Sequence, residues 1–477
     1  MARALGSILI IMGVIFLTPL AGFVFYPSER SSAAPFLVSG LSLMLVGTLL
    51  VLASGKRGKA PLSELNGSVV VLLSWLLACL VSTIPLMRLG SLGFTQALFE
   101  SVSGWTTTGL SVVDVTSASH TILLWRSIMQ LAGGAGLAII MLAAFSMPIG
   151  AGLYRAEGRT DQLVPHVVRS AKLVMMLYLG YAVAGIIAYR IAGMSLFDAI
   201  NHSFAAVSTG GFSTRAESIG YWDSPLIEAI TIPLMILGNT NFLTAYLLFS
   251  RKFRAFFRNG ELRLFALLFV VGSITVFFAV SIGLYPTLGK GIRVAIFESV
   301  TALTTTGFST VGYGSWNPTG ILILIILMLI GGGTCSTAGG IKQYRVYLLG
   351  KSIWWEIKRS LSPRNAIIAR RIHQGEDYSF VSVDHIMRTG TFVFLYIAVF
   401  LMGSCFIATF GYSMSDSLFE FASSLGTVGL SVGITGAGTP LPVLWVQIVG
   451  MLLGRLEFFV VFVAIGKMAR DVKDLNH

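Results

Sequence analysis

Four short clusters of Thr, Ser and Gly could bind a cation through main-chain oxygens. They read FESVSGWTTTGLS (99–111), NHSFAAVSTGGFS (201–213), FESVTALTTTGFS (297–309) and FEFASSLGTVGLS (419–431). Each ends in Gly, then Leu or Phe, then Ser. Because Gly adopts positive φ at little cost, such a turn could aim the preceding carbonyls at a common axis, where they replace the water shell of an ion. One such cluster would favour an ordinary packing turn, but four equivalent copies favour a cation pore.

The elements around these clusters have lengths that suit a lipid bilayer. Roughly 20 helical residues span a hydrocarbon core of about 30 Å. Apolar runs of this kind predict ten spans: 5–26, 34–54, 67–87, 121–147, 171–191, 225–249, 264–284, 318–348, 386–410 and 440–466. Semi-apolar stretches at 94–105, 196–207, 292–303 and 415–425 are too short to cross, and each leads into one cluster. A short helix that ends at the turn points its negative dipole end toward a bound cation.

Composition supports a membrane protein and argues against nucleic acid as a partner. The chain is 55% apolar and 11% charged, and its mean hydropathy is +0.82. The net charge of +12 comes from Lys and Arg in short segments between apolar runs, which is the pattern of cytoplasmic loops. Cys79, Cys335 and Cys405 are too far apart for a metal-binding motif or a disulfide framework.

The repeated unit is helix, short re-entrant helix, turn, helix. We expect an all-α polytopic fold in which four such pseudo-repeats surround a central pore, preceded by two N-terminal transmembrane helices. The first of these we interpret as a retained helix rather than a cleaved signal peptide. The expected division is 1–60 for the two N-terminal helices, then repeats at 61–165, 166–258, 259–380 and 381–477. Basic segments at 55–59, 155–172, 251–263 and 342–371 alternate with the turns, so we expect every turn to enter from outside and both termini to be cytoplasmic.

These motifs resemble the pore loops of the Trk/Ktr/HKT superfamily of K⁺ transporters over residues 67–470. The two extra helices, STGGFST and WRSIMQLAGGAG (125–136) are most similar to its TrkH/TrkG branch. The resemblance implies K⁺ uptake across the plasma (inner) membrane, with one Gly per loop closing a selectivity filter. By position, the filter residues would be Thr107, Thr108, Gly109, Thr209, Gly210, Gly211, Thr305, Thr306, Gly307, Thr427, Val428 and Gly429.

A glycine-rich segment interrupts the span 318–348. Each Gly costs a helix roughly 1 kcal/mol relative to Ala, and broken helices in transporters line the conduction path. The family resemblance implies a gating loop beneath the filter at 331–340, comprising Gly331, Gly332, Gly333, Thr334, Cys335, Ser336, Thr337, Ala338, Gly339 and Gly340. A flexible kink is the alternative. Lys342 and Gln343 do not complete a phosphate-binding loop.

Two kinds of ionisable residue lie at membrane depth. Arg455, in the last span, resembles the family's pore-facing arginine and would repel K⁺ as a barrier; the alternative is a buried ion pair that holds helices together. Glu100, Glu298 and Glu420 lie nine residues before their glycines. We expect them to cap the starts of the short helices, with concentration of cations as the alternative role.

Two other functions compete with K⁺ transport, and the family implies partners. A transporter of Na⁺ or ammonium is one alternative. An intramembrane serine hydrolase is the remote one, because Gly429–Gly433 matches G-x-S-x-G around Ser431, although repetition already explains Ser431. The resemblance implies a homodimer in the lipid bilayer and a separate cytosolic, nucleotide-binding regulatory ring of the TrkA type. It also implies that K⁺ is the transported ion, and we expect no organic cofactor on this chain.

Overall fold

The protein is a bundle of helices with one small hairpin, seen in a computed structural model that describes residues 1–55, 63–136, 139, 167–363, 369–374 and 377–475. The long helices are α1 (Ala2–Leu17), α2 (Ala33–Ala53), α3 (Glu64–Leu89), α8 (Val167–Ile191), α13 (Gly260–Val276), α16 (Gln343–Ser360), α17 (Val383–Ala408) and α20 (Phe458–Leu475). Short 3₁₀ segments η1 (Thr18–Val24), η2 (Pro27–Ser32) and η4 (Ser218–Trp222) and a π-helical turn η5 (Phe277–Ser281) adjoin them. The expected N-terminal helix is part of the bundle, since α1 packs against α2 and α3.

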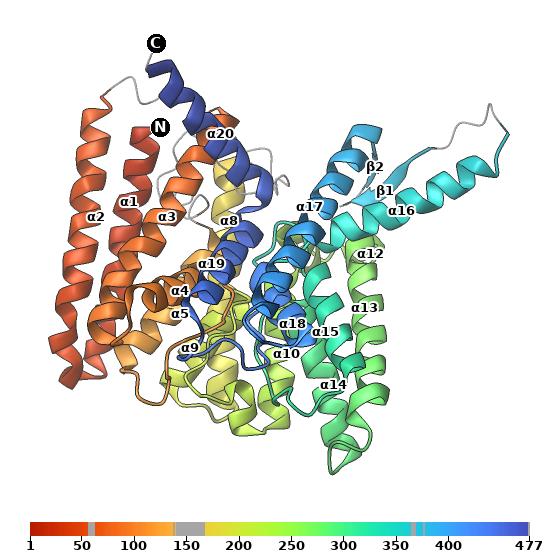
Figure 1. Ribbon diagram of the computed structural model, residues 1–477, viewed down its shortest axis with the longest axis horizontal. Coiled ribbons are helices and arrows are strands. Elements are labelled where there is room, and N and C mark those ends of the chain that lie inside the picture. Colours follow the sequence, from red (N-terminus) through yellow and green to blue (C-terminus); the bar gives the residue numbers. More distant parts are fainter. Residues whose placement is uncertain (56–62, 137–138, 140–166, 364–368, 375–376, 476–477) are drawn as a thin grey trace.

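Four short helices lie in the middle of the bundle, one before each Thr/Ser/Gly cluster (Figure 1). They are α4 (Phe94–Trp105), α9 (Leu196–Val207), α14 (Leu288–Leu303) and α18 (Met414–Leu425). The expected bounds of the first two are confirmed, and α14 begins four residues earlier than the stretch 292–303. Each of the four helices follows a residue with extended backbone. In three of them this residue caps the helix: the side chains of Ser195, Thr287 and Ser413 accept a hydrogen bond from the backbone amide of the third helical residue.

In every repeat, the helix that follows the turn is shorter than a membrane span. These helices are α5 (His120–Ala135), α10 (Pro225–Asn239), α15 (Pro318–Ile330) and α19 (Leu441–Leu456). The expected continuous spans 225–249 and 440–466 are therefore wrong: α10 breaks at Thr240 before α11 (Phe242–Phe249), which α12 (Phe253–Arg258) follows. Between α19 and α20 the chain bends by 99°. The span 121–147 stops as a helix at Gly136, and 137–138 and 140–147 lie outside the described residues.

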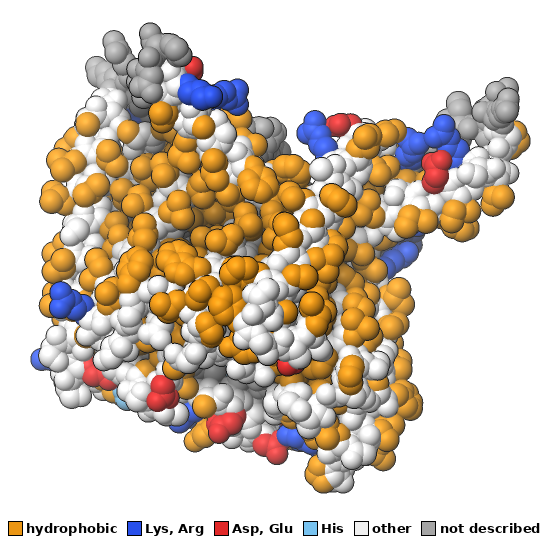
Figure 2. Space-filling view, in the orientation of Figure 1, with side chains coloured by type: hydrophobic (Ala, Val, Ile, Leu, Met, Phe, Trp, Pro, Cys, Tyr) orange, Lys and Arg blue, Asp and Glu red, His pale blue; other side chains and the backbone are white. Residues whose placement is uncertain are grey.

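Six described helical stretches are long and apolar enough to cross a membrane, or seven if the bent pair α19–α20 counts as one span. Apolar side chains cover the body of the molecule between two ends that carry the charged residues (Figure 2). The amino and carboxyl termini lie at the same end (Figure 1). At that end α16 projects sideways with an antiparallel hairpin of β1 (Arg371–Gln374) and β2 (Asp377–Phe380), an addition to the expected all-helical fold.

Glycines allow α1 and α2 to pack closely. A Cβ built on Gly6 would overlap the carbonyl oxygen of Gly47, and one on Gly13 would overlap that of Gly40. Small residues at such contacts let helix backbones approach in a bilayer, where dispersion rather than the hydrophobic effect drives packing.

Replacing Gly47 by Leu should therefore force α1 and α2 apart. We expect a loss of about 1–3 kcal/mol, the usual cost of overpacking, seen as a lower thermal unfolding midpoint of the purified protein in detergent. Gly180→Leu is the matched control, because a Cβ on Gly180 of α8 meets nothing within 4 Å. Equal midpoints for the two variants would contradict the close-packing argument.

Candidate functional site

Each short helix ends in the same hydrogen-bonded turn. The amide of the residue before each key glycine donates to the carbonyl five residues back: Thr108 to Ser103 (2.9 Å), Gly210 to Ala205 (2.8 Å), Thr306 to Thr301 (3.0 Å) and Val428 to Ser423 (2.8 Å). The amide of the preceding Thr donates to the carbonyl three residues back. This pair of bonds is a Schellman motif, which requires a left-handed residue at the first position after the C-cap.

Threonine occupies that left-handed position in all four turns. Thr107, Thr209, Thr305 and Thr427 have φ of 57°, 51°, 53° and 50°. The four glycines that follow also have positive φ, from 72° at Gly211 to 103° at Gly429. Positive φ was expected at the glycines, but not at threonine, where it is uncommon and strained. The repetition in four copies indicates a backbone shape that the site requires.

The four turns pack against one another in a closed ring. A Cβ built on Gly109 would overlap the carbonyl oxygen of Gly210, and one on Gly211 would overlap that of Thr306. A Cβ on Gly307 would overlap the carbonyl oxygen of Val428, and one on Gly429 would overlap that of Thr108. Each glycine therefore leaves room for the carbonyl of the next repeat, and the fourth repeat closes on the first.

The acidic residues hold the chain that leaves each turn. Glu100 accepts hydrogen bonds from the Ser111 hydroxyl (3.0 Å) and the Val112 amide (3.0 Å). Glu420 accepts equivalent bonds from Ser431 (2.8 Å) and Val432 (3.2 Å). In the second repeat, His202 takes the place of Glu and its Nε2 lies 2.9 Å from the Ser213 hydroxyl.

Glu298 does the same in the third repeat. Its carboxylate accepts from the Thr310 amide (2.8 Å) and hydroxyl (2.8 Å) and from the Tyr313 hydroxyl (2.5 Å). The expectation that Glu100, Glu298 and Glu420 cap the starts of the short helices is wrong, because each lies well inside its helix and is fully buried. The carboxylates instead satisfy backbone that has no helical partner at membrane depth.

Two side chains of α5 join the first repeat to the second. Buried Arg126 forms an ion pair with Glu100 (2.6 Å) and donates to the Ser213 carbonyl (3.3 Å), and its guanidinium lies 3.9 Å from the Phe212 ring centroid. Gln130 donates to the Gly210 carbonyl and accepts from the Phe212 amide (3.1 Å). The sequence did not single out either residue as a support.

The ring separates a wide mouth from a narrow cavity. On one side a cavity of about 390 Å³ is lined by all four glycines and by Ser111, Ser213, Ser309 and Ser431. Asp114 also lines this mouth, and hydrogen bonds from Thr116 and Ser117 hold the pKa of its carboxyl below the usual value. On the other side lies a cavity of about 50 Å³, bordered by Cys335, Ala338, Gly339, Lys342 and Arg455.

The expected helix break at 331–340 is present and lies directly against the ring. The chain is non-helical from Gly331 to Lys342. The Gly339 amide donates to the Thr305 hydroxyl (2.7 Å), and the Thr209 hydroxyl donates to that of Thr337 (3.1 Å). A Cβ on Gly339 would overlap the Thr427 hydroxyl. The segment thus contacts three of the four turns.

Hydrogen bonds from residues of α10, α13 and α16 hold residues 331–340 in place. The Gly333 amide donates to the Asn239 side chain (3.1 Å), and Glu261 accepts from the Thr334 amide (2.6 Å) and hydroxyl (2.9 Å). The Gln343 side chain donates to the Gly331 carbonyl (2.9 Å). The break in α10 at Thr240 is thus part of the same arrangement, and the polar run Gly238–Asn241 inside an apolar span was the signal that could have revealed it.

Arg455 connects three repeats through backbone carbonyls. It donates to the Thr337 carbonyl (2.6 Å), and to the carbonyls of Gly133 and Gly134 at the end of α5. Glu457, two residues on, pairs instead with Arg345 (2.6 Å). The ion pair across the bend is thus formed by Glu457 and Arg345, while Arg455 binds carbonyl oxygens.

The fold and this site define a polytopic membrane protein in which four equivalent turns close one ring between a wide mouth and a narrow cavity. A family model described as "TrkH: Cation transport protein" matches residues 35–472. The chain belongs to this family.

Its relatives match over almost their whole length. The chain is 32% identical to the Trk system potassium uptake protein TrkG of Escherichia coli, covering 94% of this chain and 93% of TrkG. It is 31% identical to TrkH of E. coli, covering 97% of both, and 31% identical to an uncharacterized cation transporter of Methanocaldococcus jannaschii, covering 96% and 93%. The crystal structure of the potassium transporter TrkH from Vibrio parahaemolyticus superposes with a TM-score of 0.83 at 27% identity, covering 97% of each chain. These relatives are named as transporters, not enzymes.

Removing one anchoring carboxylate should loosen the fold. Glu298→Ala leaves the Thr310 amide and the Tyr313 hydroxyl without their acceptor, and each unsatisfied buried group costs about 1–3 kcal/mol. We expect a clearly lower thermal unfolding midpoint in detergent. Glu356→Ala, at an exposed position of α16, should leave the midpoint unchanged; an equal effect of both would contradict the anchoring role.

Proposed function

We propose that this chain carries K⁺ into the cell through the ring of four turns. The ligands are the carbonyls of Thr107, Thr108, Thr209, Gly210, Thr305, Thr306, Thr427 and Val428, with Gly109, Gly211, Gly307 and Gly429 closing the filter. The observation that carries the proposal is the cyclic contact of each glycine with the carbonyl of the next repeat. The names of TrkG and TrkH as potassium uptake proteins support K⁺ as the cargo.

The chemistry of the donors suits an alkali cation. Main-chain and hydroxyl oxygens are the ligands that hard cations prefer. Two of the equivalent threonine hydroxyls, those of Thr107 and Thr427, are buried and have no hydrogen-bond partner among the described residues, although unpaired buried hydroxyls are costly. An ion on the axis would supply the partner that both of these oxygens need.

The segment 331–340 and Arg455 form the gate in this proposal. Residues from Gly331 to Gly340 block the path beneath the ring, and the bonds of Arg455 to the Thr337 carbonyl and to α5 hold them there. Opening requires these bonds to break. A cytosolic partner that moves α16, which follows the segment directly, could transmit that change.

The proposed orientation places both termini in the cytoplasm. They lie at one end of the molecule (Figure 1), and the mouth opens at the other side of the ring. The basic segments at 251–263 and 342–371 favour a cytoplasmic location for the end that carries the termini. The division into repeats at 61–165, 166–258, 259–380 and 381–477, after the N-terminal pair at 1–60, belongs to this proposal.

The proposed assembly is a homodimer in the plasma (inner) membrane with a cytosolic regulatory ring. The relatives are named as parts of a Trk system, which supports a separate nucleotide-binding TrkA-type subunit. The segments 251–263 and 349–390 are candidates for its docking site because they lie on the proposed cytoplasmic side.

Gly307→Ser should weaken ion selection. A Cβ at this position would overlap the Val428 carbonyl and would be strained at φ 83°, so the ligand geometry must shift. Bilayer recording of the purified protein with K⁺, Rb⁺ and Na⁺ should show a K⁺/Na⁺ preference reduced by about tenfold, equal to about 1.4 kcal/mol. Gly312→Ser, at a mouth position where a Cβ meets nothing within 4 Å, is the control. An unchanged K⁺/Na⁺ preference of the Gly307→Ser variant would show that Gly307 is not part of the filter.

Rescue of a K⁺-uptake-deficient strain at low external K⁺ tests the cargo itself. We expect rescue when the regulatory subunit is supplied. If the protein is expressed in the membrane without rescue and takes up Na⁺ or ammonium, the alternative function is correct and K⁺ transport is not.

Arg455→Gln should raise the resting conductance. The change removes the charge and the bonds that hold residues 331–340 under the ring, so we expect basal K⁺ current to increase severalfold, corresponding to about 1 kcal/mol. Arg470→Gln, an exposed position on α20, should conduct as the unmodified protein does. If the two variants show the same basal current, Arg455 has no role in gating.

A further inference from the structure

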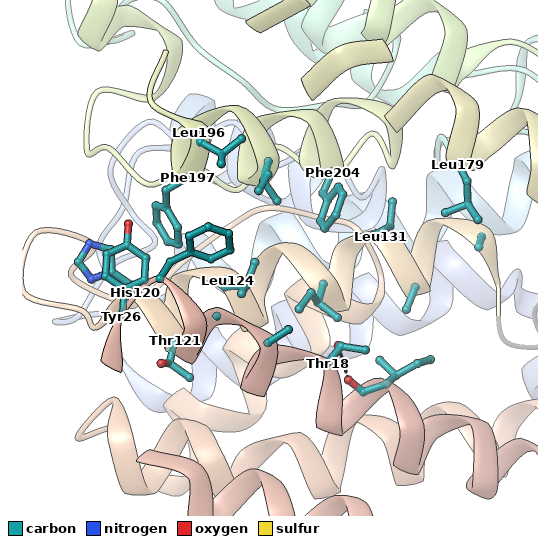
Figure 3. A pocket seen from close by; sticks show the side chains of 18 of the residues that line it. Thr18, Tyr26, His120, Thr121, Leu124, Leu131, Leu179, Leu196, Phe197 and Phe204 are labelled. Carbon is teal, nitrogen blue, oxygen red and sulfur yellow. Dashed lines mark hydrogen bonds between the residues drawn. The ribbon is translucent and has the colours of Figure 1, made fainter. Parts of the chain in front are cut away.

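A large apolar pocket lies beside the pore, between the N-terminal helix pair and the first two repeats. It has a volume of about 650 Å³, within the range of about 300–1,000 Å³ typical of small-molecule sites. Its walls come from η1, α5, α8 and α9 (Figure 3), and the side chains inside are mostly apolar, among them Leu124, Ile128, Leu131, Leu179, Phe197 and Phe204.

One end of this pocket is polar. The Tyr26 and His120 rings stack with centroids 3.8 Å apart, and both form T-shaped contacts with the Phe197 ring. Thr121 lies at the same end (Figure 3), and Ser195 also lines the pocket. The other end, at Leu131 and Leu179, is apolar (Figure 3). A pocket with this gradient suits an amphiphile rather than a polar solute.

The two acidic side chains near the polar end are bound by other groups of the chain. Glu29 is already bound by the His120 and Thr121 amides (3.0 and 2.8 Å), and Asp198 by the Thr214 hydroxyl (2.6 Å) and Arg215 (2.9 Å).

Arg190 is exposed at the end of α8. It donates to the Met194 carbonyl (3.3 Å), next to Ser195 in the pocket wall. It lies eleven residues from Leu179, close to three helical turns, and so on the same face of α8. This end thus carries an accessible cation beside acids that have their own partners.

We propose that this pocket holds one acyl chain of a membrane phospholipid, with the lipid phosphate at the Tyr26–His120 end. From His120 to Ala135, α5 rises about 22 Å at 1.5 Å per residue, which exceeds one leaflet of a core of about 30 Å. The leaflet is the one on the side of the mouth, because α5 begins directly after the segment that lines the mouth. Since the stretches Ala2–Val24 and Arg169–Ile191 are long and apolar enough to cross a membrane, the lipid would reach the pocket from the bilayer itself.

The bound chain would touch the supports of the ring. Ile128 and Leu131 line the pocket, and on the same helix Gln130 holds Gly210 and Phe212. The Tyr178 hydroxyl donates to the Leu131 carbonyl (2.9 Å) from the pocket wall. Helix α9, whose Phe204 faces the pocket, ends in the turn at Thr209. The lipid therefore packs against the two helices that join the first repeat to the second.

Photolabelling tests this proposal without any transport measurement. The full chain is reconstituted in phosphatidylethanolamine–phosphatidylglycerol vesicles with a trace of phosphatidylglycerol that carries a diazirine in one acyl chain. Peptide mass spectrometry should find labels in 15–26, 124–135 and 196–204. A diazirine near the glycerol should label residues by Tyr26 and His120, and one near the chain end should label residues by Leu131 and Leu179.

A pair of variants on α8 separates pocket lipid from surrounding lipid. Leu179→Trp fills the pocket and should reduce these labels by about fivefold or more, because a packed site does not accept added volume. Val183→Trp, one turn away, is as exposed as Leu179 (56% against 47%) but is not part of the pocket wall, and it should leave the labels unchanged.

Four outcomes would overturn the proposal. Labels spread evenly over the lipid-facing helices, or reduced equally by both variants, would mean surrounding lipid only. Labelling by a diazirine free fatty acid but not by the phospholipid probe would exclude the phospholipid. Cross-links between two copies through α1 and α8 would mean that this face is a contact between chains. If both variants keep the elution and the thermal unfolding midpoint of the unmodified protein, misfolding is not the cause of any loss of labels.

Discussion

Backbone that leaves a helix within the bilayer must find its hydrogen-bond partners from the side, and this requirement shapes the whole site. Each turn uses one buried side chain, Glu100, His202, Glu298 or Glu420, to bind the chain that leaves it. Because these groups sit on the short helices, the helices set the height at which the turns meet. The rest of the bundle positions four short helices so that the turns close one ring.

The four repeats share the turn but differ in its supports. The first repeat adds the cation Arg126 to its carboxylate, and the second replaces the carboxylate by His202. The third adds Tyr313, whose hydroxyl reaches Glu298 from beyond the turn. The charges behind the ring are therefore unequal, although the carbonyls at the ring are arranged alike. Asymmetry is also found on the other side of the ring, where residues 331–340 of the third repeat contact three of the four turns.

Much of this arrangement could be predicted from the sequence because the same pattern of residue types occurs in all four repeats. The short helices, the key glycines and the glycine-rich break after Ile330 follow from residue types and spacing. The role of Glu100, Glu298 and Glu420 did not follow, since their partners lie after the turn and depend on its shape. The breaks at Thr240 and Glu457 were also missed, because neither contains a glycine run and apolar length alone indicates a continuous helix.

The closure of the ring has a consequence for how the protein is made. The Gly429 contact with Thr108 joins the last turn in the chain to the first, so three repeats leave one side open. In the proposed function, a nascent chain in the membrane would therefore lack a complete set of ion ligands until its final helices are inserted.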